Sequence, residues 1–504
     1  MLRAFFQGQS LYDLLVIGGG INGAGIARDA QGRGLKCLLV EARDLASATS
    51  SASSKLIHGG LRYLEQYEFR LVREALIERE VLLKLAPHLV RPLSFVLPHR
   101  PHLRPVWMIR LGLFLYDHLG GRERLPGSFA IDTHTHPFGK PLASDIARAF
   151  VYADCWVDDA RLVVLNARDA ADRGAEVRTR TRCVEARREC GAWRCRLADE
   201  SGTTTEVETR ALVNAAGPWV NEVMGQVVRA NSPKRLRLIK GSHIIVPKIH
   251  DGEQAYILQN EDRRIVFVLP YEGRFSLIGT TDEPFDGDPA SVAISAAETM
   301  YLCDVVTRHF RTRVAPEDVV WTYAGVRPLY DDADVVASQV TRDYAFDVDL
   351  DSAGGTPLLS IFGGKITTYR KLAEHALDRL LPHLRRGEGA WTGRAPLPGG
   401  AMPGADFEAF LADLQQRLPW LPNPRRLARA YGTEVDRLVG DAKSADDLGR
   451  DFGFGFTERE LAYLVEREWA RMPDDVLWRR SKLGLHLSAE AKTDIAEWFT
   501  RRNS

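Results

Sequence analysis

Apolar residues near the start of the chain follow the pattern of a strand, a helix and a second strand. Leu14 to Ile17 are consecutive apolar residues, as expected of a buried strand. An alanine-rich stretch follows, and Gly32 and Gly34 mark its end as a helix. A second apolar run then ends at Glu41. The pattern predicts a β-α-β unit over residues 12–42.

Periodic patterns recur along the rest of the chain. Apolar residues at helical spacing predict helices over 69–85, 157–174 and 294–310, the first ended by Pro87 and the second capped by Asp158. Alternating apolar and polar residues predict strands from 175 to 213, and four strand-like runs between 240 and 281 predict an antiparallel sheet.

Two regions give a different picture. Residues 122–150 predict no clear element, and His134 and His136 within them suit a surface loop better than a metal site. A Gly/Pro-rich link over 386–405 leads to a helical C-terminal region with no recognisable catalytic group.

An apolar and aromatic run from Val106 to Tyr116 allows two interpretations. Arg110 interrupts the run, and the histidines and arginines of 99–104 precede it. Such a segment can lie in a membrane interface with its cations towards the lipid head groups. It can also be a core helix whose arginine reaches solvent. From the residues alone, the core helix is favoured.

Charge and cysteine content restrict the partners and the compartment. Lys and Arg together number 67, as do Asp and Glu, so no overall field attracts nucleic acid, and no nucleic-acid partner is expected. The six cysteines form no C-x-x-C pair and no zinc spacing, which predicts free thiols in a reducing compartment and no metal. The first ten residues lack the features of a signal peptide, and no apolar run reaches about 18 residues. An intracellular protein that does not cross a membrane is expected.

The turn of the β-α-β unit carries a nucleotide-binding motif. Gly18, Gly20 and Gly23 occupy the glycine positions of G-x-G-x-x-G. The first permits a tight turn, the second lets a pyrophosphate approach the backbone, and the third lets helix and strand pack closely. Glu41 ends the second strand, where a carboxylate can hold a ribose hydroxyl. Together these features predict a bound dinucleotide.

Further candidate residues follow this unit. A Ser/Thr-rich stretch over 47–54 runs into Lys55, His58, Arg62 and Tyr63, which suit an anionic polar ligand better than a solvated linker. A strand that ends in Ala215–Ala216–Gly217 suggests a second approach of the backbone to the cofactor. Arg327, at the end of a predicted strand beside Gly and Pro, is either a presented cation or a surface one.

A third glycine feature bears on the identity of the cofactor. Gly363 and Gly364 follow a strand, and a helix is predicted to start near Ile366. Backbone N–H groups at such a start can face an oxygen that becomes negative, as a reduced flavin does at its N1/O2 edge. This favours FAD over NAD. Lys365 can face either the ring or an anionic substrate.

With these motifs in view, the chain resembles the FAD-dependent, membrane-associated sn-glycerol-3-phosphate dehydrogenases of bacterial respiration. The resemblance is carried by IGGGINGAGIARDAQGRGL, ATSSASSKLIHGGLRYLE, NAAGPWV, IGTTD and FGGKITTYRKLAEHAL, and it spans about residues 12 to 380. It implies an α/β fold with an FAD-binding Rossmann-like domain of the glycine-oxidase type, a mixed, largely antiparallel β substrate domain and an all-α C-terminal domain. The boundaries expected are 12–90, 150–235 and 320–385 for the FAD domain, 91–149 and 236–319 for the substrate domain, and 386–504 for the helical domain.

The resemblance also implies a reaction and its partners. Glycerol 3-phosphate would be oxidised to dihydroxyacetone phosphate by hydride transfer to flavin N5, and the electrons would pass to a membrane quinone. The chain would then lie on the cytoplasmic face of the inner membrane as a peripheral protein, with 102–119 as the contacting segment, and a homodimer is compatible with it. The alternatives are a glycerol-3-phosphate oxidase that uses O2 and an amine or amino-acid oxidase of the same fold.

The residue roles that the resemblance implies fall into three groups. His58, His243, Arg327 and Lys365 would be catalytic, with His58 or His243 as the proton acceptor. Arg62, Tyr63, Thr281, Arg327 and Lys365 would bind the substrate. The residues that would bind FAD are Gly18, Gly20, Asn22, Gly23, Glu41, Ala42, Thr49, Ser50, Ser54, Lys55, Leu56, His58, Gly59, Ala216, Gly217, Gly363, Gly364, Lys365, Ile366 and Thr367.

Overall fold

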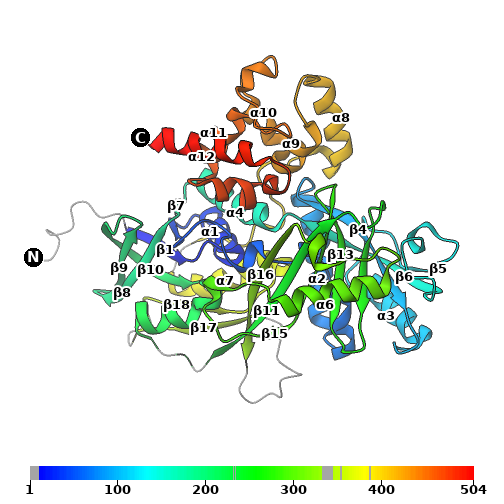
Figure 1. Ribbon diagram of the computed structural model, residues 1–504. Helices are drawn as coiled ribbons and strands as arrows, with labels where there is room; N and C mark the ends of the chain where they lie inside the picture. Colours follow the sequence, from blue (N-terminus) through cyan, green and yellow to red (C-terminus); the bar gives the residue numbers. More distant parts are fainter. Residues whose placement is uncertain are drawn as a thin grey trace, which may run out of the picture.

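The computed structural model describes residues 11–503, apart from 231, 233, 332–343, 352–354 and 385–386. The first ten residues, which lack the features of a signal peptide, lie outside the described residues, as does the expected domain boundary at 385–386. Two β-sheets lie side by side, and the C-terminal helices, orange to red in Figure 1, lie above the first sheet.

The first sheet is largely parallel and contains the predicted β-α-β unit. In the described part of the chain its order is β17-β18-β10-β1-β2-β7, with β9 and β8 continuing antiparallel from β10. The strands are β1 (Leu11–Ile17), β2 (Cys37–Val40), β7 (Glu176–Arg178), β8 (Thr181–Glu189), β9 (Ala192–Asp199), β10 (Thr204–Asn214), β17 (Ala345–Asp349) and β18 (Leu358–Phe362). Helices α1 (Ile21–Gly32), α4 (Asp159–Asp172) and α7 (Tyr369–Leu384) bury the main core against Leu14, Val16 and Leu39. Because β1, β10 and β18 run parallel, the segments after them meet at one edge.

The second sheet is antiparallel except for the β4–β12 pair. Its strands among the described residues are β3 (Leu56–Ile57), β4 (Val90–His99), β5 (Phe129–Asp132), β6 (Arg148–Val157), β11 (Arg235–Pro247), β12 (Ala255–Gln259), β13 (Ile265–Tyr271), β14 (Phe275–Gly279), β15 (Glu283–Pro284) and β16 (Trp321–Asp331). Helix α6 (Ala296–His309) packs with Ile244 on one face, and α2 (Phe69–Leu85) and α3 (Val106–Leu119) pack with Ile245 on the other. Strands β3 and β16 and most of β6 fall in the ranges expected to form the FAD domain, but their hydrogen bonds place them in this sheet.

The predicted elements between 69 and 310 are found, together with strands that the sequence did not predict, among them β4 and β6. Helices α2, α4 and α6 correspond to the three predicted helices, and Asp158 caps α4 by accepting a hydrogen bond from Arg161 N at 3.1 Å. The range 122–150 contains β5, which the sequence did not predict. It pairs with β6 alone, and only Ile131 of its four residues is buried, so no alternation of buried residues marks it.

Helix α3 lies at the surface, so the core-helix interpretation of 106–116 is wrong. Only Leu113 and Tyr116 of the helix are buried, whereas the side chains of Trp107, Leu111 and Phe114 are 63%, 51% and 57% exposed. None of the helices in the described ranges is both long and apolar enough to span a bilayer.

The C-terminal region has a hydrophobic core of its own, built from residues such as Leu427, Leu461 and Ile495. Its helices are α8 (Phe407–Arg417), α9 (Pro424–Tyr431), α10 (Val435–Val439), α11 (Glu458–Glu468) and α12 (Ala489–Asn503). A π-helical turn, η12 (Asp475–Arg480), lies between α11 and α12 and contacts α4.

Candidate functional site

The glycine turn after β1 has no room for side chains. Gly18 has a φ of +112°, and a Cβ there would lie 2.6 Å from Ala215 O. A Cβ on Gly23 would lie 1.9 Å from Gly18 O, so the first turn of α1 packs directly on the backbone before it. Two of the predicted glycine roles, the tight turn and the close helix packing, are therefore visible in the geometry.

The three glycine features predicted separately meet at this turn. Gly18 contacts Ala215 and Ala216 at the end of β10. Asn22, in the first turn of α1, donates from Nδ2 to Gly363 O at 3.2 Å. Gly364 has a φ of +101° and approaches Asn22 so closely that a Cβ would lie 2.8 Å from its Nδ2. Asn22 Oδ1 is buried with no hydrogen-bond partner in the described part of the chain, as expected of an acceptor kept for a ligand.

Glu41 and Ser50 complete this turn. The carboxylate of Glu41 accepts from Gly19 N at 2.6 Å and from Arg43 N at 2.8 Å. Burial raises the pKa of Glu41, although these hydrogen bonds act against the rise. Ser50 Oγ accepts from Ile21 N at 3.0 Å, at the start of α1. The roles of both side chains at the cofactor stay predictions.

His58, Tyr63 and Lys365 form a second group. His58 N donates to Thr367 Oγ1 at 3.3 Å, which joins the loop after β3 to the segment after β18. Lys365 Nζ lies 4.0 Å from the centre of the Tyr63 ring. Burial lowers the pKa of His58, and the Lys365 charge lowers it further, so the imidazole is neutral at pH 7. The side chain of Arg62 is half-buried in the short helix η2 (Leu61–Gln66) beside Tyr63.

His243 and Arg327 form a third group on neighbouring strands. The ring of His243, on β11, stacks on Tyr323 of β16 at 4.7 Å, and its Nε2 lies 2.9 Å from Ser54 Oγ. Burial lowers the pKa of His243 well below its usual value. Arg327 donates to Asp282 at 2.6 Å and to Thr280 Oγ1 at 2.8 Å, so its guanidinium is held in one position.

Two predicted residues lie in buried networks. Lys55 Nζ donates to both Asp159 oxygens at 2.9 and 3.0 Å, so its charge is neutralised inside the protein. Thr281 Oγ1 donates to Glu298 Oε1 at 2.8 Å and accepts from Ser242 N at 3.0 Å. Thr281 is fully buried, whereas Lys55 also lines a cavity, and the roles of both at cofactor and substrate stay predictions.

Glu298 is a functional candidate that the sequence analysis missed. Besides the Thr281 hydroxyl, it accepts from Ser242 Oγ at 2.8 Å, and it forms an ion pair with Lys240 at 2.8 Å. Burial alone would raise the pKa of Glu298, but the bonds from Lys240, Ser295 N, Ser242 and Thr281 prevail and lower it to about 2. The capping box of Ser295 and Glu298 was readable in the sequence, but its contact with β11 was not.

Comparisons with known proteins agree with this geometry. The profile of the FAD dependent oxidoreductase family matches residues 13–370, and that of the C-terminal domain of alpha-glycerophosphate oxidase matches 390–502. The aerobic glycerol-3-phosphate dehydrogenase of Escherichia coli (strain K12) is 55% identical over 490 residues, covering 97% of both chains. The D-erythritol 1-phosphate dehydrogenase of Brucella abortus is 52% identical over 494 residues, covering 97% of this chain and 98% of the relative.

A solved structure extends the likeness to three dimensions. The glycerol-3-phosphate dehydrogenase of Bacillus halodurans, complexed with FAD, superposes with a TM-score of 0.76 at 28% identity, covering 98% of this chain and 94% of the other. The fold class and the FAD cofactor expected from the sequence are confirmed. The chain therefore belongs to the FAD-dependent glycerol-3-phosphate dehydrogenase family, within the FAD-dependent oxidoreductases.

Proposed function

We propose that this protein oxidises sn-glycerol 3-phosphate to dihydroxyacetone phosphate and passes the electrons to a membrane quinone. One observation carries the proposal: two neutral imidazoles each have a cation near them, Lys365 for His58 and Arg327 for His243, and His243 Nε2 lies 2.9 Å from the hydroxyl of Ser54, close to His58 in the chain. An alcohol oxidation needs a proton acceptor, and a phosphorylated substrate needs cations. The activity named for the Escherichia coli relative supports the same substrate.

The residues at the glycine turn fit FAD. The backbone of Gly18 to Gly20 is free of side chains, as a diphosphate requires, and Glu41 lies beside it for a ribose hydroxyl. We assign the flavin end of the cofactor to the segment from Gly363 to Thr367, which joins Asn22 to the His58 loop. Asn22, with its unpartnered Oδ1, lies between the glycine turn and the segment from Gly363 to Thr367.

The division of work among the side chains follows from their chemistry. Bound FAD supplies the acceptor for the hydride that leaves C2. His58 or His243 takes the proton of the C2 hydroxyl, because burial keeps both rings neutral at working pH. Arg327, Lys365 and Arg62 supply positive charge for the phosphate, and the planar fork of arginine suits two phosphate oxygens. Glu298 fixes the Thr281 hydroxyl behind His243.

Anaerobic addition of glycerol 3-phosphate is expected to bleach the visible absorption of the bound flavin. Subsequent addition of a quinone should restore it, because electrons would leave to that acceptor. The measurement is a visible spectrum of the purified protein under argon. An unchanged spectrum would contradict the substrate. Recovery with oxygen and peroxide release, but without any response to quinone, would indicate an oxidase.

A second substrate has a specific observation in its favour. The Brucella abortus relative, at 52% identity, is named for D-erythritol 1-phosphate, a longer polyol phosphate. Both compounds offer a phosphate to Arg327 and a secondary hydroxyl to the imidazoles. Comparison of kcat/KM for the two substrates decides which one this chain prefers.

Helix α3 is our proposed contact with the membrane. Its exposed Trp107, Leu111 and Phe114 form an apolar face, and Arg104 and Arg110 lie near them with exposed side chains. A helix of this kind lies in the interface between lipid head groups and acyl chains. A bilayer is the fitting occupant because a quinone acceptor resides there.

The double variant Trp107→Ser/Phe114→Ser is therefore expected to bind lipid vesicles about 10-fold or more weakly, through loss of buried apolar area. Vesicle co-sedimentation measures this. Met472→Ser, which changes a 52% exposed apolar residue in the C-terminal region, is the matched control. Equal vesicle binding by the two variants would remove α3 from the interface.

A further inference from the structure

The Trp/Arg-rich stretch near the C-terminus is a motif that the proposed reaction does not use. Residues 475–482, which we call the clamp segment, comprise the π-helical turn η12 and the two residues after it. π-Helical turns are rare in proteins, and those that occur often lie at functional sites. The segment belongs to the helical C-terminal region, yet its charged side chains reach into the FAD-binding part of the chain.

The clamp segment holds Asp44 through a buried set of charge-assisted hydrogen bonds. Both terminal nitrogens of Arg480 and the Nε of Arg479 donate to the Asp44 carboxylate, one of them at 2.7 Å. The side chains of Arg480 and Asp44 are 0% and 2% exposed. Burial acts to raise the pKa of Asp44, but the two guanidinium groups outweigh it and lower the pKa. The carboxylate is therefore charged and fully committed to the clamp.

Asp44 lies in the loop that encloses the glycine turn. Glu41, three residues earlier, accepts from Gly19 N, and Ala46, two residues later, donates to Gly19 O at 3.1 Å. Loop 41–46 therefore follows the shape of the turn on which the FAD diphosphate is proposed to lie. A displacement of Asp44 would move Glu41 and Ala46 together.

The clamp segment holds the neighbouring backbone as well. Arg180 N donates to Arg43 O at 2.7 Å, and the Arg180 guanidinium donates to Asp475 at 2.9 Å. Asp475 also pairs with Arg479. Loop 41–46 is thus tied to the clamp segment directly through Asp44 and indirectly through Arg180.

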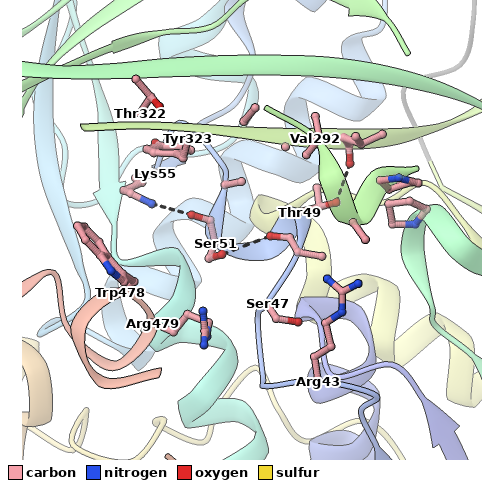
Figure 2. Close-up of a pocket in the computed structure, with 18 of the residues that line it drawn as sticks. Arg43, Ser47, Thr49, Ser51, Lys55, Val292, Thr322, Tyr323, Trp478 and Arg479 are labelled. Carbon is pink, nitrogen blue, oxygen red and sulfur yellow. Dashed lines mark hydrogen bonds between the residues drawn. The ribbon is translucent and has the colours of Figure 1, made fainter. Parts of the chain in front are cut away.

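Leu45 and Ala46 pack one side of this loop into the main core, whereas Arg43 borders a cavity on the other side. The cavity has a volume of about 320 Å³ and is lined by Arg43, Ser47 and Thr49 on the loop side and by Trp478 and Arg479 on the clamp side. Figure 2 shows Arg43, Ser47 and Arg479 among the residues around this space. The side of loop 41–46 that borders the cavity is therefore held by ionic contacts and not by core packing.

The clamp segment itself is anchored at two of its residues. The ring of Trp478 stacks on Trp321 of β16 at 4.0 Å. Arg480 Nε donates to Glu468 O at 3.0 Å, at the end of α11. The guanidinium groups are thus presented from a fixed position.

We infer that the clamp segment retains FAD: Arg479 and Arg480 hold loop 41–46 on the glycine turn through Asp44, and so slow the release of the cofactor. The residues are positioning residues, since they act through Asp44 and Glu41. The inference depends on FAD lying at the glycine turn, as proposed above, and it does not depend on the substrate.

The test measures the Kd and the release rate of FAD with reconstituted apoprotein, from the fluorescence of freed flavin. Arg480→Met should raise the FAD Kd roughly 10- to 100-fold, the range known when a group that orients a ligand is removed. Arg480→Lys, which keeps the charge, should recover part of the affinity. Asp44→Asn changes the same contact from the loop side. This variant provides the test if Arg480→Met does not fold.

Arg429→Met is the matched control. Arg429 is also an arginine that joins the two regions, through a hydrogen bond from its guanidinium to Pro87 O at 3.1 Å, but it touches neither loop 41–46 nor the clamp segment in the contacts described. It should lower the melting temperature and leave the FAD Kd unchanged. The double variant Asp44→Asn/Arg480→Met should lose no more affinity than Asp44→Asn alone, because Asp44→Asn already weakens the contact that Arg480→Met deletes.

Wild-type Kd and release rate in Arg480→Met and Asp44→Asn would overturn the inference, as would an equal loss in Arg429→Met. If FAD does not lie at the glycine turn, the result is different, because the Gly23→Ala variant would then retain FAD. Absence of flavin bleaching by glycerol 3-phosphate, with normal retention behaviour, would refute the substrate alone.

Discussion

Replacing Gly23 with alanine is expected to abolish FAD binding and to destabilise the first sheet. The added Cβ would lie 1.9 Å from Gly18 O and 3.1 Å from Gly18 C, both backbone atoms of the turn. No side-chain rotation relieves such contacts, so α1 must move away from β1 and the turn must open. Overpacking a core costs about 1–3 kcal/mol, and a backbone obstacle belongs at the upper end. The same movement separates Gly18 from Ala215 and Asn22 from Gly363, which are the contacts that define the cofactor site.

The flavin content of the purified protein and its melting temperature measure the two effects. Gly112→Ala is the matched control, because Gly112 lies inside helix α3 and a Cβ there meets nothing within 4 Å. Alanine at an open helical position is favourable by about 0.5–1 kcal/mol. Gly23→Ala protein that contains a full complement of FAD would show that the cofactor does not lie at this turn.

The parts of this molecule that the sequence predicted are those specified by local patterns. The apolar run before Gly18, the spacing of the three glycines and the Asp158 cap act over a few residues, and each is found in the structure. The approach of the Ala215 and Gly363 segments to the cofactor turn was expected as well. Gly18, Ala215 and Gly363 each follow one of the parallel strands β1, β10 and β18.

The remaining features depend on pairings between distant residues. Lys55 was predicted to suit an anionic ligand, and its ion pair with Asp159, on a helix more than a hundred residues away, had no local signal in the sequence. Glu298 was recognisable as a helix cap, whereas its second use as the acceptor for Thr281 depends on how α6 packs against β11. Strand β5 was missed because an edge strand with exposed faces carries no periodic signal. Nothing in the sequence links Arg480 with Asp44.

Replacing Arg327 with methionine is expected to lower kcat/KM for glycerol 3-phosphate by about 30- to 1,000-fold, equivalent to about 2–4 kcal/mol of lost charge-assisted hydrogen bonding. The guanidinium is fixed by Asp282 and by Thr280 Oγ1, so it is already oriented before a phosphate arrives. Its removal deletes that cation and also leaves Asp282, a carboxylate, unpaired beside the bound phosphate. Because the phosphate does not react, the lost interaction is equal in ground and transition states, and the rise should appear mainly in KM.

Steady-state kinetics of three variants separate this role from a structural one. Arg327→Lys keeps the charge but loses the planar fork, so its kcat/KM should fall between those of the wild type and Arg327→Met. Arg264→Met is the matched control: Arg264 pairs with Asp262 at 2.8 Å, and its side chain is 32% exposed, close to the 38% of Arg327. An exposed pair of that kind contributes about 0–1 kcal/mol, so kcat/KM should be unchanged. Equal kinetics in Arg327→Met and the wild type would place the phosphate elsewhere, because a desolvated cation in contact with the substrate cannot be removed without loss of affinity.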